Sequence, residues 1–141
     1  MNIFYFVHPK DEVSYLTSSE TLDSAVLRMR KNRFTAIPVI TKKGEYFGTV
    51  SDGDFLHFIL KHGRTDSEFL SGYTVSDIVD KTKNPPAKVN STLSAIMLQI
   101  TDQNFVPVTD DRGVFIGIIT RRDILRHFNE KYTAKKASEK E

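Results

Sequence analysis

Two stretches of the chain have the apolar spacing of an amphipathic helix, and the second stretch repeats the first. Apolar residues fall at positions 0, 3, 4 and 7 of a pattern in residues 21–31, and the same spacing returns in residues 92–100. Thr21 and Thr92 stand at the start of the two patterns, where a helix N-cap is expected. The sequence therefore predicts a helix in each half of the chain. Six side chains of these helices are predicted to be buried: Leu22, Val26, Met29, Leu93, Met97 and Ile100.

A pair of short apolar strands is predicted after each helix. The first strand of each pair holds a proline, Pro38 or Pro107, and the second strand follows a turn with a glycine. Because proline cannot donate to a strand ladder, it indicates an edge strand or an irregular strand start. Five matched positions, from Pro38 and Pro107 through to Asp54 and Asp123, are separated by 69 residues. The helix faces are separated by 71 residues, so the second copy is two residues shorter between its helix and its strands.

An apolar segment also opens each repeat. Residues 3–7 place apolar side chains at i, i+3 and i+4, and residues 75–79 repeat that spacing. Taken alone, the aromatic run at the start could equally be a strand. The second copy, however, begins with Thr74 and Asp77 in capping-box spacing, which favours a short helix in both copies. A short alternating strand is then predicted over residues 13–16.

The repeats divide the chain into four parts. Residues 1–60 form the first repeat, residues 61–72 a polar connector without a site, and residues 73–129 the second repeat. Residues 130–141 are a polar tail that we expect to be frayed and flexible. A chain of 141 residues is long enough for one compact domain, or for two small repeats that share a core. The predicted fold class is α+β, with two pseudo-symmetric repeats, each a small sheet with helices packed on one face.

Composition narrows the classes of function. Hydrophobic residues make up 39% and charged residues 27%, and no apolar run approaches the roughly 18 residues of a membrane span. The start of the chain lacks the features of a signal peptide. The absence of cysteine excludes disulfides and thiolate metal sites and fits a reducing compartment, so we expect a cytoplasmic protein. The net charge of +2, with scattered Lys and Arg, is too small to indicate nucleic-acid binding, and we expect neither nucleic acid nor a membrane as a partner.

The segment that closes each repeat is the strongest candidate site. Residues 48–54 (GTVSDGD) and 117–123 (GIITRRD) both lead from a glycine through apolar residues to a hydroxyl residue and, three residues later, an aspartate. This order predicts a strand, a hydroxyl cap and a helix. Unpaired N–H groups at a helix N-terminus can hold phosphate, and a nearby aspartate can accept hydrogen bonds from ribose hydroxyls. The same spacing is close to a capping box, which needs no ligand, although its duplication favours a ligand site.

Together with the hydrophobic-Pro-Val strands at residues 37–39 and 106–108, these segments resemble the CBS domain, and two in tandem resemble a Bateman module. The resemblance covers nearly all of residues 1–129 and leaves no catalytic domain, as in stand-alone CBS pairs of bacteria. It implies a regulatory module that binds an adenine nucleotide in the clefts between the repeats. AMP and ATP are the ligands most expected, with ADP, related adenosyl compounds and cyclic di-AMP as alternatives. The resemblance also implies a homodimer and an unknown downstream protein partner.

The resemblance further implies roles for individual residues. Thr120 would contact phosphate and Asp123 the ribose hydroxyls, and Ser51 and Asp54 would have these roles in the other cleft. The adenine pocket would be lined by residues just before each Pro-Val strand and by the stretch that leads into the repeat, residues 82–87. The named candidates for this pocket are Asn104, Phe105, Thr35, Ala36, Thr82 and Ala87.

Charge distinguishes the two clefts. Arg121 and Arg122 lie inside the second motif and could pair with phosphate oxygens. Asp52 and Gly53 occupy these places in the first motif, where the aspartate would repel an anion. We therefore expect the second cleft to bind better than the first. The alternative is that both arginines are only solvated residues at the start of a helix.

The sequence has no catalytic or metal-binding pattern. The four histidines lack metal-ligand spacing, and nucleophile-elbow, phosphate-loop and dinucleotide fingerprints are missing. We therefore expect no enzyme activity, no metal and no cofactor other than a nucleotide ligand. A ligand-free dimerisation scaffold is the alternative function, in which the two motifs only cap helices. The apolar helix faces at residues 55–60 and 124–128 would pack against a second copy or within the chain's own core.

Overall fold

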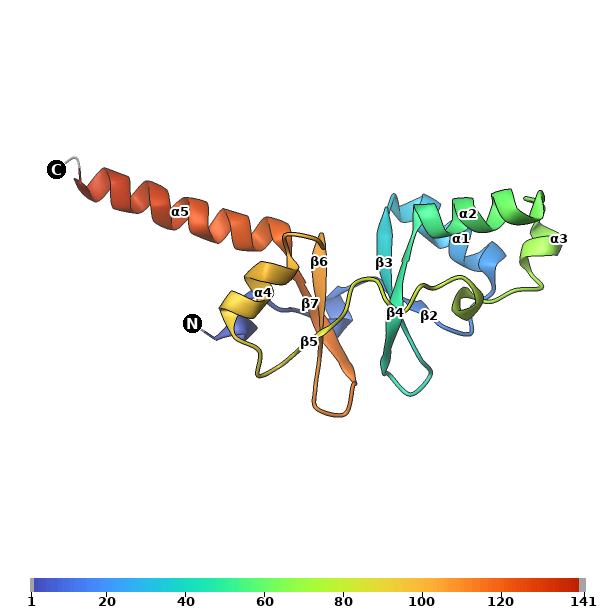
Figure 1. Ribbon diagram of the computed structural model, residues 1–141, viewed down its shortest axis with the longest axis horizontal. Coiled ribbons are helices and arrows are strands. Elements are labelled where there is room, and N and C mark those ends of the chain that lie inside the picture. Colours follow the sequence, from blue (N-terminus) through green and yellow to red (C-terminus); the bar gives the residue numbers. More distant parts are fainter. Residues whose placement is uncertain (1, 140–141) are drawn as a thin grey trace.

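The computed structural model describes residues 2–139, which form two similar halves lying side by side (Figure 1). Each half contains a small sheet and the helices that cover it. The first half holds β2 (Leu16–Thr17), α1 (Leu22–Asn32), β3 (Ala36–Ile40), β4 (Tyr46–Ser51) and α2 (Asp52–His62). The second half holds β5 (Ala87–Lys88), α4 (Leu93–Gln99), β6 (Phe105–Thr109), β7 (Phe115–Thr120) and α5 (Arg121–Glu139). The predicted α+β fold of two pseudo-symmetric repeats is confirmed.

The two sheets repeat the same strand order and register. In the first sheet the order is β2-β3-β4, and the antiparallel strands β3 and β4 pair Ile37 with Val50. In the second sheet β5, β6 and β7 follow the same order, and β6 and β7 pair Val106 with Ile119 at the equivalent positions. The fixed spacing of the two motifs in the sequence therefore reflects two hairpins of the same geometry.

The hairpin turns also join the two halves. Tyr46 N–H donates to Gly113 O at 3.0 Å, and Phe115 N–H donates to Gly44 O at 2.9 Å. Both glycines have a positive φ, +87° at Gly44 and +83° at Gly113, which residues with a Cβ rarely adopt. The rings of Tyr46 and Phe115 stack beside these bonds, with their centroids 6.3 Å apart. The turns thus hold the halves together around their pseudo-twofold axis.

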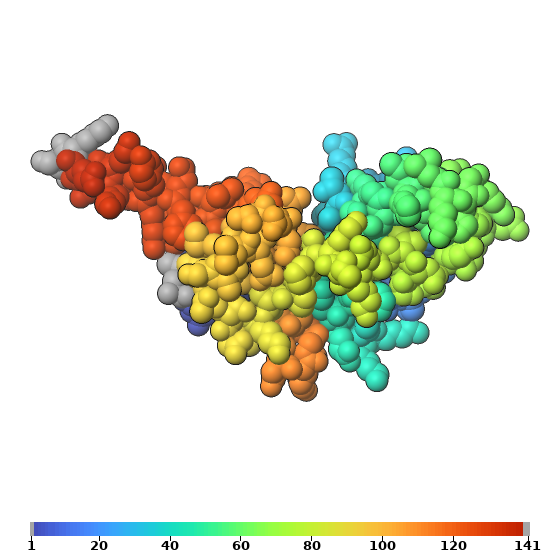
Figure 2. All heavy atoms as spheres, viewed as in Figure 1, coloured from blue at the N-terminus to red at the C-terminus, as the bar shows by residue number. Residues whose placement is uncertain are grey.

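The opening segment of each repeat packs on the opposite half. η1 (Ile3–Phe6) buries Ile3 and Phe6 in the core of the second half, and β1 (His8–Pro9) adds an antiparallel strand to β7. η3 (Val75–Asp77) buries Val75 in the core of the first half in the same way. The short helices expected at both places are 3-10 helices. The chain from η3 to β5 then crosses the junction of the halves on the face shown in Figure 2.

Three segments differ from the expected elements. The polar connector contains a short helix, α3 (Ser67–Leu70), whose Leu70 is buried in the first core. The strand expected over residues 13–16 is shorter and later, because η2 (Lys10–Glu12) precedes it and pairing begins only at β2. The tail does not fray at residue 130: α5 continues through residues 130–139, and residues 140 and 141 lie outside the described part.

The long helix α5 projects away from the second half (Figure 1). Its sequence contains no glycine or proline between its ends, and its last ten residues are rich in Lys, Ala and Glu, which favour helix. All side chains of residues 130–139 are exposed, so the segment is a solvated extension as well as a helix. In the described part of the chain, no helix combines the length and apolarity needed to cross a membrane.

The two proline-containing strands are interior strands, not edge strands. β3 lies between β2 and β4, and β6 lies between β5 and β7. Pro38 pairs with Thr49 of β4, but the register with β2 begins only at the next residue, Val39. Pro107 likewise lies one residue before Val108, where the pairing of β6 with β5 begins. The missing N–H therefore falls where the strand has a single paired neighbour, which is why proline is tolerated there.

The predicted helix burial is correct for three of the six residues, partly correct for two and wrong for one. Leu22, Met29 and Ile100 are buried, and Val26 and Leu93 are partly buried against the two cores. Met97 is 40% exposed, so its predicted burial is wrong. The reason is that Ile96 of α4 and Ile100, the residue that follows the helix, point into the core, and the residue after Ile96 is rotated by about 100° toward solvent.

Candidate functional site

The second motif forms the strand-to-helix turn that the sequence predicts. β7 ends at Thr120, α5 begins at the next residue, and the Thr120 hydroxyl accepts a bond from the Asp123 backbone N–H at 3.2 Å. Along β7, Ile119 is buried in the second core, whereas Ile118 and Thr120 on either side of it are partly exposed. The turn therefore presents a hydroxyl and the first N–H groups of a long helix outside the core.

A cleft of about 380 Å³ lies between the two halves at this turn. Its walls are largely apolar, because Pro38 of the first half lines it together with Phe105 and Ile118 of the second. Thr120 lines it as well. Three polar residues of the N-terminal segment complete this part of the lining: His8, Glu12 and Ser14. The cleft thus combines apolar walls, which suit a flat ring system, with a few polar groups that can orient it.

The Asp123 carboxylate lies beside this cleft and is held by His8. Its Oδ2 is paired with His8 Nε2, and the Asp123 side chain is 30% exposed. Burial alone would raise the pKa of this carboxyl, but bonds from His8 and Thr120 and the charges of His8 and Arg126 bring the pKa below its ordinary 3.8. Asp123 is therefore an ionised acceptor at neutral pH.

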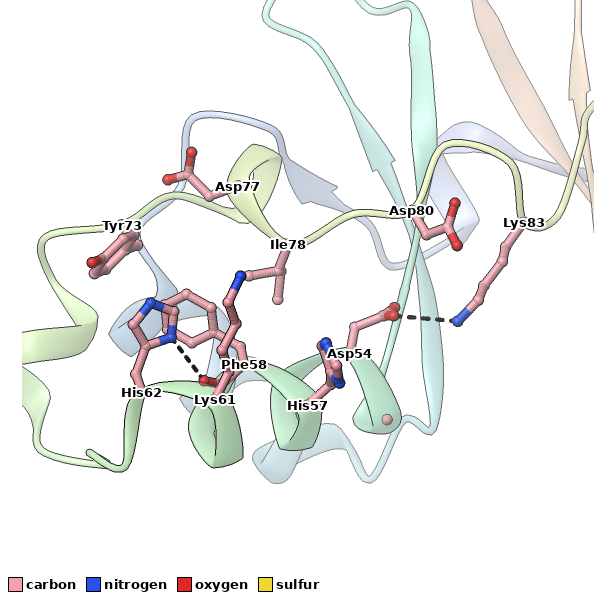
Figure 3. A pocket seen from close by; sticks show the side chains of 11 residues that line it. Asp54, His57, Phe58, Lys61, His62, Tyr73, Asp77, Ile78, Asp80 and Lys83 are labelled. Atoms are coloured by element: carbon pink, nitrogen blue, oxygen red, sulfur yellow. Dashed lines mark hydrogen bonds and ion pairs between the residues drawn. The ribbon is translucent and has the colours of Figure 1, made fainter.

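In the first motif, Ser51 and Asp54 form a reciprocal capping box. Ser51 N–H donates to Asp54 Oδ2 at 2.8 Å, and Asp54 N–H donates to Ser51 Oγ at 3.3 Å. The Asp54 side chain is only 9% exposed, and its Oδ1 lies 3.5 Å from Lys83 Nζ (Figure 3). The alternative in which the motif only caps a helix therefore describes the first copy well.

A second hollow, of about 730 Å³, extends along α2 beside Asp54 (Figure 3). His57 and Lys61 reach it from α2, whereas Asp77 and Asp80 come from the chain that follows α3. The connector, which was expected to carry no site, contributes Lys61 to this lining. The mixed charges favour no single class of ligand. Within residues 2–139 no group of three His, Cys, Asp or Glu side chains is arranged to hold a metal ion.

Arg121 has a structural contact that the sequence does not reveal. Its guanidinium donates to Ile100 O at 2.6 Å, to Thr101 O at 3.4 Å and to Asn104 Oδ1 at 3.0 Å. These acceptors lie just after α4, where helix carbonyls lack partners within the helix. Arg121 is therefore engaged at the end of α4 and does not point its charge into the cleft as expected. Arg122 is exposed at the start of α5, as in the alternative of a solvated residue.

The residues expected before the two Pro-Val strands are only partly brought together. Asn104 and Phe105 line the cleft beside Thr120, and Ala36 lines the same cleft from the first half. Thr35 lines a separate groove of about 280 Å³ between α1 and α2, and its carbonyl accepts the Asp52 N–H at 3.0 Å. The cleft at Thr120 is therefore lined by Ala36 as well as by Asn104 and Phe105, although the sequence assigned Ala36 to the other cleft.

The stretch 82–87 lies beside the first motif. Thr82 N–H donates to Asp80 Oδ1 at 3.0 Å, and the next residue, Lys83, reaches Asp54. Ala87 is buried in the second core, where β5 pairs with β6. Beside the second motif the corresponding stretch is the N-terminal segment with His8, which is not among the site residues expected from the sequence. In the sequence, the only indication that this segment is equivalent to residues 75–79 is the apolar spacing that residues 3–7 share with them. No sequence pattern indicates that each of these segments packs on the opposite half.

Comparison with known proteins agrees with this architecture. The family model for the CBS domain matches the chain twice, over residues 7–61 and 75–130. The chain belongs to the CBS domain family. The resemblance drawn from the two motifs is confirmed, and the protein is a tandem CBS pair.

Three relatives are similar over most of this CBS pair. Cyclic di-AMP receptor B of Bacillus subtilis is 28% identical over 125 residues, which cover 89% of this chain and 84% of the relative. A crystal structure of CbpB in complex with c-di-AMP is 31% identical, with a TM-score of 0.89 over 98% of this chain and 91% of that chain. The Listeria monocytogenes CbpB protein in complex with c-di-AMP is 25% identical, with a TM-score of 0.83 over 94% and 98% of the two chains.

Proposed function

We propose that this CBS pair is a regulatory module that binds an adenine nucleotide in the cleft lined by Pro38 and Phe105. The observation that carries the proposal is a cap hydroxyl, Thr120, in an apolar cleft between the repeats, with the ionised carboxylate of Asp123 paired to His8, which lines the same cleft. The apolar walls would hold adenine, the start of α5 would hold phosphate, and Asp123 would accept the ribose hydroxyls. The relatives named for cyclic di-AMP support this role.

Among the adenine nucleotides, we place cyclic di-AMP ahead of AMP and ATP. With Arg121 engaged at the end of α4, the described lining of the cleft contains Glu12 and neither lysine nor arginine. Each of the two phosphodiesters of cyclic di-AMP carries one negative charge, so the phosphate group that enters the site brings one charge, whereas the terminal phosphate of AMP or ATP brings nearly two at pH 7. A site with few cations desolvates the singly charged group at lower cost. The protein would act as a regulator and not as an enzyme, in the cytoplasm, through a downstream protein partner.

Calorimetric titration with cyclic di-AMP, AMP and ATP tests the proposal, with cyclic di-GMP as the control for the base. A ligand at 100 times its dissociation constant should add about 2.7 kcal/mol to the free energy of unfolding, which a thermal-shift assay detects. If no adenine compound binds or shifts the melting curve, the ligand-free scaffold is the better account. That second candidate is favoured by the reciprocal capping box of Ser51 and Asp54, which needs no ligand.

We also propose that the chain forms a homodimer. Leu56 and Leu60 on α2 are 57% and 72% exposed, and Leu125 on α5 is 59% exposed. Leu56 and Leu125 are equivalent positions of the two repeats, so both helices offer an apolar face that a second copy could cover. Sedimentation at micromolar concentration should show a dimer. A single species of 16.1 kDa would contradict the proposal.

A further inference from the structure

The two motif aspartates have different partners although their positions are equivalent. Asp54 Oδ2 accepts the backbone N–H of Ser51, which completes the capping box. In the second motif the Asp123 N–H donates to Thr120 Oγ, but the Asp123 carboxylate is turned to His8. The Asp123 side chain is accordingly 30% exposed, against 9% for Asp54. In the second motif the carboxylate is therefore paired with a residue outside the motif, whereas in the first motif it is paired within the motif.

His8 reaches Asp123 because β1 lies along β7. The two strands pair antiparallel, with His8 opposite Ile118 and Pro9 opposite Gly117. His8 lines the cleft at Thr120 and also a hollow of about 380 Å³ on the Asp123 side. Its ring therefore stands between the proposed nucleotide cleft and the first turn of α5. The exchange of the opening segment between the halves fixes this position.

We propose that His8 is a positioning residue of the nucleotide site, which holds the Asp123 carboxylate out of the capping box and within reach of ribose hydroxyls. This inference rests on the proposed nucleotide site. Without His8, Asp123 can turn back to the Thr120 N–H, as Asp54 does to that of Ser51. A nucleotide would then have to break the capping bond before it could use the carboxylate. An ionised carboxylate has about four acceptor positions, so the bond to His8 leaves room for a ribose.

Calorimetric titration of His8→Ala with cyclic di-AMP, and with AMP in parallel, tests this role. We expect the dissociation constant to rise about tenfold, the effect of losing one hydrogen bond to a charged group. His8→Gln keeps an N–H donor at a similar reach and should restore most of the affinity. His57→Ala removes an exposed histidine from α2 and is the matched control, with unchanged affinity expected.

The double variant His8→Ala/Asp123→Ala separates positioning from direct contact. If His8 acts only through Asp123, the double variant should bind as Asp123→Ala does. An affinity of His8→Ala equal to or above that of the wild type would overturn the inference, as would a further loss in the Asp123→Ala background. Failure of His8→Gln to recover affinity would also contradict it. If the wild-type protein binds neither nucleotide, the proposed function fails first, and this inference fails with it.

Discussion

Gly117 lies directly against the backbone of His8. A Cβ atom at Gly117 would stand 2.1 Å from His8 O and 2.8 Å from Val7 Cγ1, closer than real Cβ atoms approach. Gly48 has the same relationship with Val79 in the first repeat, where a Cβ would stand 2.5 Å from Cγ1. The glycine that begins each motif is therefore required by the segment of the other repeat that crosses it.

Gly117→Ala should lower the free energy of unfolding by about 1–3 kcal/mol, because β1 must move away from β7 to admit the methyl group. Urea denaturation measures the change. Gly53→Ala is the control: its Cβ would meet only Ser51 Oγ at 3.6 Å, and alanine in α2 should stabilise by roughly 0.5–1 kcal/mol. A Gly117→Ala variant as stable as the wild type would be incompatible with the close approach of β1.

The sequence was sufficient to predict the fold because each repeat carries its own local signals. The Pro-Val strands, the glycine turns and the hydroxyl caps recur at fixed spacing, and each acts within a few residues of itself. Met97 shows the limit of this reasoning. Its helix has only seven residues, and the 3.6-residue period alone could not decide whether Ile96 or Met97 pointed inward.

The candidate site was less predictable because its contacts join residues far apart in the chain. Thr120 and Asp123 lie three residues apart, so their geometry could be inferred from the local pattern. The contact of His8 with Asp123 depends on the exchange of the opening segment, which no local pattern encodes. The bond of Arg121 to Ile100 O was not predictable for the same reason, since Ile100 lies 21 residues earlier in the chain.

Arg121→Ala should lower the free energy of unfolding by about 1–3 kcal/mol, because the carbonyls at the end of α4 lose a charged donor. Its affinity for cyclic di-AMP should stay at the wild-type value. Arg122→Ala, at the neighbouring exposed position, should change stability by less than about 0.5 kcal/mol. Loss of affinity in Arg121→Ala without loss of stability would restore the phosphate role first expected for this residue.

Tyr46 joins the first hairpin to the chain that leads into β5. Its hydroxyl donates to Asn84 O at 2.8 Å and lies 2.7 Å from Thr49 Oγ1. Burial raises the pKa of Tyr46 to about 12, while the bond with Thr49 acts in the opposite direction. The folded pKa is above the ordinary 10.0, so this residue's stabilising contribution is complete below pH 10 and is lost as pH rises from about 10 to 12.

Tyr46→Phe should lower the free energy of unfolding by about 0.5–1.5 kcal/mol at pH 7, the value of one hydrogen bond. It should also reduce the loss of stability above pH 10, and ultraviolet titration should show that one late-titrating tyrosine has disappeared. Tyr132→Phe, on the exposed extension of α5, is the control: it also removes one tyrosine, but it should leave the stability and the late-titrating component of the curve unchanged. A late-titrating component as large in Tyr46→Phe as in the wild type would contradict the burial of the Tyr46 hydroxyl.

The two motif aspartates provide the sharpest test of ligand site against helix cap. Asp123→Ala should weaken cyclic di-AMP binding by roughly 1.5–3 kcal/mol, because an ionised acceptor for the ribose hydroxyls is removed. Asp54→Ala should lower the free energy of unfolding by about 1 kcal/mol through the lost capping box, with little change in affinity. Calorimetry and melting curves for both variants measure the two effects. If Asp123→Ala loses only stability and binds as tightly as the wild type, both motifs are caps, and the cleft lined by Pro38 and Phe105 is not the nucleotide site.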